Sequence, residues 1–165
     1  EKLAEETGEV VNLMFEENGR GVHVYRSRNE VDIELPNKPG MRAPLHCTSL
    51  GKAILSHLPE EKVRNIIDEH GLQARTEHTI TDEQELFEEL ETVREQGFAI
   101  DREETMIGLR CVAAPLKSDG QVVASLSVSG PKRRMNDARL RDKVPELLLS
   151  KANVIELNLR NLRTE

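Results

Sequence analysis

The chain has 165 residues, of which 37% are hydrophobic and 32% charged, and it carries a formal net charge of −7. This length is enough for one domain with a single buried core. The acidic balance excludes a domain that grips a nucleic-acid backbone by itself, because such binding needs clustered Lys and Arg. With no Trp, one Tyr and three Phe, stacking on bases is also excluded.

Cysteine content and hydropathy indicate where the protein works. Only Cys47 and Cys111 occur, without CxxC spacing or a recognisable secretory leader, and this predicts a reducing, cytoplasmic setting. The longest apolar segments are short and interrupted by charge, so we expect no membrane contact.

The first third of the chain is expected to be mostly extended. Residues 10–36 alternate β-branched and polar residues, which predicts two or three strands, with the sequence ENGRG at residues 17–21 forming a hairpin turn at a sheet edge. The following NKPGMRAP, residues 37–44, contains two prolines and a glycine, so we expect no regular element there.

Three helices are predicted next. Residues 47–58 carry apolar residues at helical spacing up to Pro59, which opens a second helix over residues 59–70. The pattern of residues 80–97 predicts a third helix, with Thr81 as N-cap and Gln84 three residues later.

The remaining chain returns to strands and then to helix. Residues 98–104, 109–117 and 121–131 are predicted strands in the middle of the sheet, with a tight turn at residues 118–120. From Arg134 onward the spacing predicts one or two helices, with Pro145 at a start or a kink. This order indicates an α+β domain with an antiparallel sheet.

The stretch LHCTSLGKAIL, residues 45–55, contains the first candidate site. Thr48 or Ser49 fits the N-cap of the following helix. The amides of residues 49–51 would also suit a small anion, so a capping role and a binding role both stay open.

Two chemical alternatives at this stretch are disfavoured. A Cys47 nucleophile with His46 as its base is weak, because adjacent residues rarely point at one another and no orienting group is evident. A metal site is also disfavoured, because its candidate ligands lack paired short-range spacing; they are His46, Cys47, Asp101, Glu103 and Cys111. We therefore predict no catalytic residue, no metal and no cofactor.

Polar residues in the later strands are the second candidate. Ser125, Ser127 and Ser129 alternate with apolar residues and share one strand face, which is either an exposed edge or the wall of a ligand pocket. Asp101 is either an outward-facing polar residue or an acceptor inside such a pocket.

A series of motifs, taken in chain order, resembles the motifs of a known protein family. APLHCTSLGKAIL, PEEKV, a T-x-T-D helix start leading to GFAIDREE, GLRCVAAPL and VASLSVSGP follow one another over residues 44–131. Together they resemble the effector-binding domain of IclR-family transcriptional regulators. The resemblance implies a GAF-like α+β domain, with a curved antiparallel sheet flanked by helices and an effector pocket on one side. One departure is that many members have small residues where this chain has Thr48, Ser49 and Leu50, so Leu50 is expected either to narrow the pocket or to give it an apolar wall.

The resemblance also implies the site and the organisation of the protein. Residues 1–8 would end a linker helix and residues 9–165 would form the effector-binding domain, with the DNA-binding domain absent from this chain. The effector would be a small organic acid, and the oligomer would be a homodimer or homotetramer. The alternative functions are a cysteine-dependent enzyme or a thiol or metal sensor. The expected effector-binding residues are Ser49, Leu50, Gly51, Asp101, Leu109, Cys111, Ser127 and Ser129. In this hypothesis the amides of residues 49–51 and the hydroxyls of Ser127 and Ser129 hold the carboxylate, while Asp101 accepts from a ligand hydroxyl.

Overall fold

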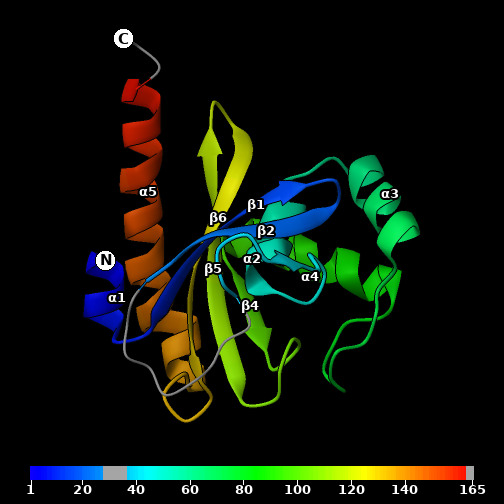
Figure 1. The fold of residues 1–165 in the computed structure, drawn as a ribbon, viewed down its shortest axis with the longest axis horizontal. Helices are drawn as coiled ribbons and strands as arrows, with labels where there is room; N and C mark the ends of the chain where they lie inside the picture. Colours follow the sequence, from blue (N-terminus) through cyan, green and yellow to red (C-terminus); the bar gives the residue numbers. More distant parts are fainter. Residues whose placement is uncertain (28–36, 163–165) are drawn as a thin grey trace.

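A single six-stranded antiparallel sheet organises the protein (Figure 1). The structure is a computed structural model that describes residues 1–27 and 37–162; the third strand predicted toward residue 36 falls outside these ranges. The strand order is β3-β2-β1-β6-β5-β4. The strands are β1 (Val10–Glu17), β2 (Arg20–Arg26), β3 (Arg42–Ala43), β4 (Ala99–Arg102), β5 (Leu109–Ser118) and β6 (Gln121–Pro131).

The helices are α1 (Lys2–Thr7), α2 (Ser49–Leu55), α3 (Glu60–His70), α4 (Glu83–Gln96), a π-helical turn (Arg139–Lys143) and α5 (Val144–Leu162). α1 and α5 lie on one face of this sheet, and α2, α3 and α4 lie on the other (Figure 1). Within the described ranges, no helix is long and apolar enough to cross a membrane.

The predicted hairpin turns are confirmed. Asn18 and Gly19 both have positive φ, 53° and 74°, and join β1 to β2 as a two-residue turn between the paired Glu17 and Arg20. Such turns match the right-handed twist of the strands they connect. The pairing of β5 with β6 continues to Ser118 and Gln121, as the predicted turn at residues 118–120 requires.

Three expectations about the sheet need correction. β4, predicted in the middle of the sheet, is an edge strand beside β5. β1 does not lie at an edge, because it pairs with β2 on one side and with β6 on the other. Residues 37–44 also contain a strand, since β3 pairs with Gly21 and Val22. A strand of two residues at a sheet edge fits between Pro39 and Pro44, because neither proline has to donate to the ladder.

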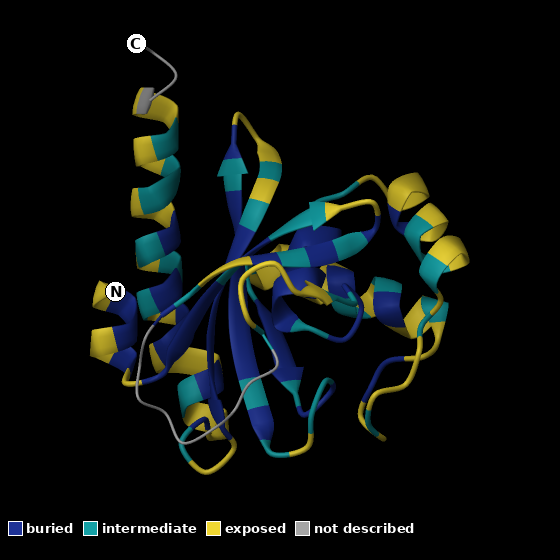
Figure 2. Cartoon of the chain, viewed as in Figure 1, coloured by how far each residue is buried: buried dark blue, intermediate teal, exposed yellow. Residues whose placement is uncertain are grey.

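Both faces of the sheet are buried, and alternate residues of one strand pack into two different hydrophobic cores. On β5, Val112 packs in the core beneath α5, whereas Ala113 packs in the core beneath α2 and α4. Figure 2 shows the result, with dark blue strands between helices whose outer sides are exposed. Burial on both faces explains why β5 reads as a nearly continuous apolar run.

The helix ends follow from local hydrogen bonds. The N-cap of α4 is Asp82 rather than the predicted Thr81, because the Asp82 carboxylate accepts from the amide of Glu85 at 2.9 Å. The predicted C-terminal helix is one continuous segment from the π-helical turn into α5. Pro145 lies inside this continuous segment, just after the π-helical turn, so the irregular turn stands where a proline cannot donate to the helical ladder.

Candidate functional site

A cavity of about 80 Å³ lies on the α2 side of the sheet and brings together distant parts of the chain. Seven of the eight residues proposed from the sequence line it. They are Ser49 and Leu50 from α2, Asp101 from β4, Leu109 and Cys111 from β5, and Ser127 and Ser129 from β6. Space of this size holds roughly five to eight water-sized spheres, which suits a molecule of few non-hydrogen atoms.

Gly51, the eighth proposed residue, does not line the cavity. A Cβ atom there would lie 2.2 to 2.6 Å from backbone atoms of Leu45, so glycine is required by the close approach of two chain segments. Its amide donates to Thr48 Oγ1 at 3.0 Å. Of the three amides expected to hold a carboxylate, the Gly51 amide therefore already has an acceptor.

The same bond settles how α2 begins. Thr48 is the N-cap, and its hydroxyl also donates to the carbonyl of Pro44 at 3.0 Å. Ser49 is the first residue of α2 and remains available at the cavity wall. The hydroxyl of Thr48 is thus occupied by a structural task.

The serines of β6 lie inside the sheet rather than at an edge. Ser127 and Ser129 are 0% and 4% exposed, because β1 and β5 cover β6 on its two sides. Asn12 of β1 pairs with Ser127, and its Nδ2 donates to Ser127 Oγ at 3.4 Å and to Ser129 Oγ at 3.3 Å. Ser125 is buried on the same strand but does not line the cavity.

Asp101 is a buried carboxyl group and not an outward-facing residue. It is 1% exposed, and its Oδ1 accepts from the amide of Glu104 at 2.7 Å. Burial raises the pKa of Asp101 to about 6, against the opposing effect of the Glu104 amide. A group with this pKa exchanges its proton close to neutral pH.

The Thr105 hydroxyl fits either protonation state of Asp101, because it donates to Asp101 Oδ2 when that carboxyl is ionised. Thr105 Oγ1 lies 2.8 Å from the carbonyl oxygen of Cys47 and 3.0 Å from Asp101 Oδ2. A hydroxyl has one hydrogen, and a carbonyl oxygen only accepts. When Thr105 donates to Cys47, its contact with Asp101 becomes a full hydrogen bond only if Asp101 Oδ2 carries a proton and donates.

Lys52 is a buried cation that does not line the cavity but bonds to the segments that carry its polar residues. Its side chain is 1% exposed, and Nζ donates to Glu104 at 2.8 Å, to Glu89 at 2.9 Å and to the carbonyl of Ile100 at 2.6 Å. Burial alone would lower the pKa of Lys52, but the two carboxylates outweigh it and raise that pKa. Burial likewise raises the pKa of Glu104 to about 7, although Lys52 opposes the rise.

The cavity wall itself carries little charge. Among its lining residues in the described ranges there is no Lys or Arg, and burial lowers the pKa of His23, so its ring is neutral near pH 7. Asp101 is then the titratable group that sets the charge of the lining: below about pH 6 it is protonated and the lining is neutral, and above that pH it carries a negative charge. Such a lining orients a small ligand through hydrogen bonds rather than through an ion pair.

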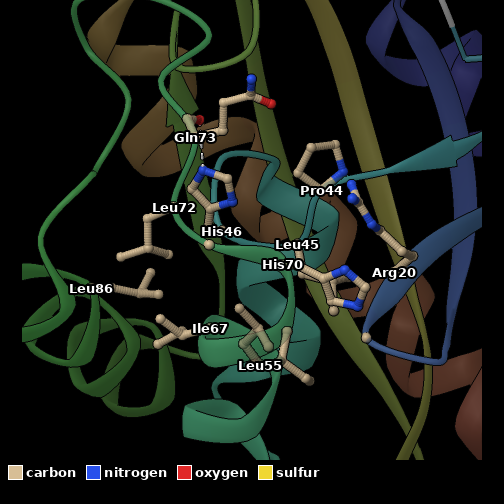
Figure 3. A pocket seen from close by; sticks show the side chains of 13 residues that line it. Arg20, Pro44, Leu45, His46, Leu55, Ile67, His70, Leu72, Gln73 and Leu86 are labelled. Atoms are coloured by element: carbon tan, nitrogen blue, oxygen red, sulfur yellow. Dashed lines mark hydrogen bonds between the residues drawn. The ribbon is translucent and has the colours of Figure 1, made fainter.

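Neither cysteine is suited to nucleophilic chemistry. Burial raises the pKa of Cys47 to about 11 and raises the pKa of Cys111 further, so both thiols stay protonated. His46 does not act on Cys47, because its Nε2 contacts the carbonyl of Gln73 at 3.0 Å (Figure 3). The cavity beside His46 in Figure 3 measures about 30 Å³, which suits two or three waters.

No metal centre is evident in the part of the chain that the structure describes. Within residues 1–27 and 37–162, no group of three or more His, Cys, Asp and Glu side chains is placed to hold an ion. Asp101 and Cys111 face each other across paired strands, but Glu103 is engaged by Lys132 at 2.9 Å instead.

Six further residues line the cavity that the sequence analysis did not propose. They are Asn12, His23, Asn37, Ala43, Thr48 and Thr105. A signal existed for Asn12 and His23, since each interrupts an apolar strand, in VVNLMF and GVHVY. Asn37 lies in a loop, where residue spacing carries no information about what it faces.

The fold and the cavity define a small-molecule-binding sensory domain, and comparison with known proteins names its family. Residues 1–157 match the family described as "Bacterial transcriptional regulator IclR C-terminal", so the chain belongs to this family of transcriptional regulators. The predicted α+β, GAF-like fold is confirmed by its structural relatives.

Individual relatives agree with this assignment. The chain is 35% identical over 163 residues to the probable HTH-type transcriptional regulator ArcR of Halobacterium salinarum, a match that covers 96% of the chain and 62% of ArcR. It superposes on Thermotoga maritima IclR with a TM-score of 0.90 and 32% identity, over 96% of this chain and 64% of that one.

A third relative was solved with a ligand. The inducer-binding domain of the Acinetobacter transcription factor PobR, a double mutant in complex with 3-hydroxybenzoic acid, superposes with a TM-score of 0.87 and 30% identity, covering 94% of this chain and 91% of that one. The chain spans about half to three fifths of the length of the curated relatives it matches.

The buried ion cluster gives the first prediction. Replacing Lys52 with Met leaves the buried Glu104 carboxylate without its cation, so we expect the free energy of unfolding to fall by about 3–5 kcal/mol in urea titrations. Lys62→Met is the matched control, because Lys62 also contacts a glutamate, Glu16, at 2.8 Å but is 48% exposed. We expect it to cost at most about 1 kcal/mol, and equal losses in both variants would contradict the prediction.

The second prediction concerns Asp101 and pH. Its pKa is 3.8 in the unfolded chain and about 6 in the folded domain, so the native state binds more protons over that interval and stability falls as pH rises through it. The Asp101→Asn amide imitates the protonated acid. We expect the variant to exceed the wild type in stability at pH 8, by at most about 3 kcal/mol, and to match it near pH 4.

Urea denaturation from pH 4 to pH 8 measures this difference, with Asp68→Asn on the exposed face of α3 as the control. Asp68→Asn should follow the wild-type profile, because its carboxyl is in solvent whether or not the chain is folded. A variant Asp101→Asn that is less stable than the wild type at pH 8 would show that the ionised carboxylate is the stabilising form.

Proposed function

We propose that this chain is the ligand-sensing and oligomerisation domain of an IclR-type transcriptional regulator, and that it binds a small organic acid in the 80 Å³ cavity. The observation that carries the proposal is the convergence of Ser49, Asp101, Ser127 and Ser129 on one enclosed polar space. In the PobR relative, the inducer-binding domain holds an acid, 3-hydroxybenzoic acid. A cavity of about 80 Å³ favours acids of few non-hydrogen atoms.

The polar groups of the cavity suit a carboxylate in a specific way. Asn12 Nδ2 donates to Ser127 and Ser129, so both serines act as acceptors there and keep their own hydroxyl hydrogens for a ligand. Hydrogen bonds to a charged group contribute about 1.5–3 kcal/mol each, so two or three of them supply an affinity in the micromolar range.

Asp101 is proposed to be protonated in the complex, because a bound anion raises its pKa above the value of about 6 in the free domain. An ionised carboxylate at 1% exposure would repel an acid effector in a cavity whose described lining residues include no Lys or Arg. A protonated Asp101 removes this repulsion while keeping its bonds to Glu104 and Thr105. The sequence-based role of Asp101 as acceptor for a ligand hydroxyl is therefore replaced in this proposal.

The effector signal has a short path to the N-terminal helix. α1 leads into β1 through Gly8, and β1 carries Asn12 of the cavity wall. The start of β1 is fixed by Glu9, whose buried carboxylate accepts from Arg134 at 2.9 and 3.0 Å. In the full regulator α1 ends the linker from the DNA-binding domain, so an effector that prefers one arrangement of the oligomer shifts the paired DNA-binding domains.

The whole protein is proposed to work as a homodimer or homotetramer in the cytoplasm, with DNA contacted only through the N-terminal domain. An enzyme is not part of this proposal, since the family consists of transcriptional regulators. A thiol sensor is disfavoured, because burial keeps both Cys47 and Cys111 protonated.

A thermal-shift titration tests the proposed function. We expect one or more small monocarboxylic acids to raise the melting temperature of the wild type, because a ligand that binds only the native state stabilises it by mass action. Ser127→Ala should lose most of this shift, since it removes a donor to the carboxylate. Ser125→Ala is the matched control on the same strand and should keep the shift.

Two results would contradict the proposal. One is an equal shift in the Ser127→Ala variant and the wild type, which would place the acid elsewhere. The other is no shift with any acid of up to about ten non-hydrogen atoms, which would remove the ligand class.

A further inference from the structure

We propose that His23 and Asn37 form a second polar wall of the cavity that recognises a hydroxyl group on the effector, so that the effector is a small hydroxy acid. This inference rests on the proposed function and specifies its ligand. Neither residue was proposed from the sequence, and both line the cavity with Ser127 and Ser129.

The first argument is an unpaired atom on each residue. Asn37 Oδ1 and His23 Nδ1 are buried, and neither has a hydrogen-bond partner among residues 1–27 and 37–162. A buried polar atom without a partner is costly, and such atoms in a native protein call for an explanation. A ligand group that reaches both atoms after a small rotation of the two side chains supplies the missing bonds.

The second argument is that a chain of hydrogen bonds fixes which end of the cavity accepts hydrogen bonds and which end donates them. Asn37 Nδ2 donates to Asn12 Oδ1 at 2.8 Å, and Asn12 Nδ2 then donates to the serine hydroxyls of β6. The amide of Asn12 is therefore used at both ends. What remains is an acceptor, Asn37 Oδ1, at one end of the chain and hydroxyl donors, Ser127 and Ser129, at the other.

An effector that complements this arrangement carries a hydrogen-bond acceptor at one end and a hydrogen-bond donor at the other. Its carboxylate meets the serine hydroxyls, and a hydrogen-bond donor meets Asn37 Oδ1. His23 makes a hydroxyl the best donor, because the ring is neutral and its Nδ1 either donates or accepts according to tautomer. A hydroxyl group donates to Asn37 and accepts from His23 at the same time.

The wall also excludes other ligands. A second carboxylate at this end would face the Asn37 carbonyl oxygen and a histidine whose protonation is opposed by burial. The backbone of His23 is fixed on both sides, since its amide donates to Met41 at 3.0 Å and its carbonyl accepts from Gly40 at 2.7 Å. The ring therefore stays at the cavity, and dicarboxylates are expected to bind poorly.

Isothermal titration calorimetry with matched acids tests the inference. The probes are propionate, lactate, 3-hydroxypropionate and malonate, which differ in whether and where a hydroxyl or a second carboxylate is present. For the wild type we expect the better of the two hydroxy acids to bind about tenfold or more tightly than propionate, because propionate leaves the buried acceptor unpaired. Malonate should bind more weakly than the hydroxy acid.

Variants connect this preference to the wall. Asn37→Ala and His23→Phe should each reduce the preference for the hydroxy acid over propionate to less than about threefold. Asn37 lies outside every helix and strand, so its variant stays informative even if His23→Phe folds poorly. Ser125→Ala, which is buried but away from the cavity, should keep the full preference.

The outcomes separate the two proposals. Equal affinity for hydroxy acid and propionate in the wild type, or a preference that survives in both Asn37→Ala and His23→Phe, would overturn this inference. If Ser127→Ala still abolished binding in that case, the proposed function would stand without it. Failure of every monocarboxylate to bind would overturn both.

Discussion

The buried ammonium group of Lys52 is the interaction on which the site depends. It connects α2, where it resides, to α4 through Glu89 and to the end of β4 and the following loop through Ile100 and Glu104. These are the segments that carry Ser49, Asp101 and Thr105 to the cavity. An ammonium group this deep in the protein is tolerated because three acceptors replace its water.

A second constraint is that the cavity lining within residues 1–27 and 37–162 contains no Lys or Arg. Lys52 Nζ donates to Glu104, to Glu89 and to the carbonyl of Ile100, so its charge is balanced by these groups and not by a ligand in the cavity. Asp101 then has no cation of its own at the wall, which is why burial dominates its pKa. Because the described lining residues supply no cation, hydrogen-bond direction selects the ligand, and a bound acid favours the protonated form of Asp101. The serines, Asn12 and Asn37 provide that direction from adjacent strands and a loop.

Much of the fold follows from the sequence, because local signals agree with the tertiary structure. The apolar spacing of Leu86, Leu90 and Val93 placed α4, and all three are buried. The turns at Asn18 and Asp119 were marked by residues that tolerate positive φ. The cap of α4 was misplaced by one residue, because Thr81 and Asp82 are both good caps and only the path of the chain chooses between them.

The site was only partly accessible from the sequence. Residue alternation grouped Ser127 with Ser129, but it left open whether they faced solvent or a pocket, because the answer depends on β1 pairing with β6 across more than a hundred residues. The combination of those serines with Asp101, Leu109 and Cys111 came from the family resemblance. Asn12, His23 and Asn37 were missed, since strand register and loop conformation decide what they face, and neither is encoded in local spacing.

The most direct measurement is a carbon-13 NMR titration of the Asp101 side-chain carboxyl in the free and acid-bound domain. The structure predicts a pKa of about 6 in the free domain and a higher one with the acid bound, because the bound anion further disfavours ionisation of Asp101. A carboxyl that titrates near 3.8 in the free domain, or whose pKa is unchanged by the bound acid, would contradict the account of a protonated Asp101 in the complex.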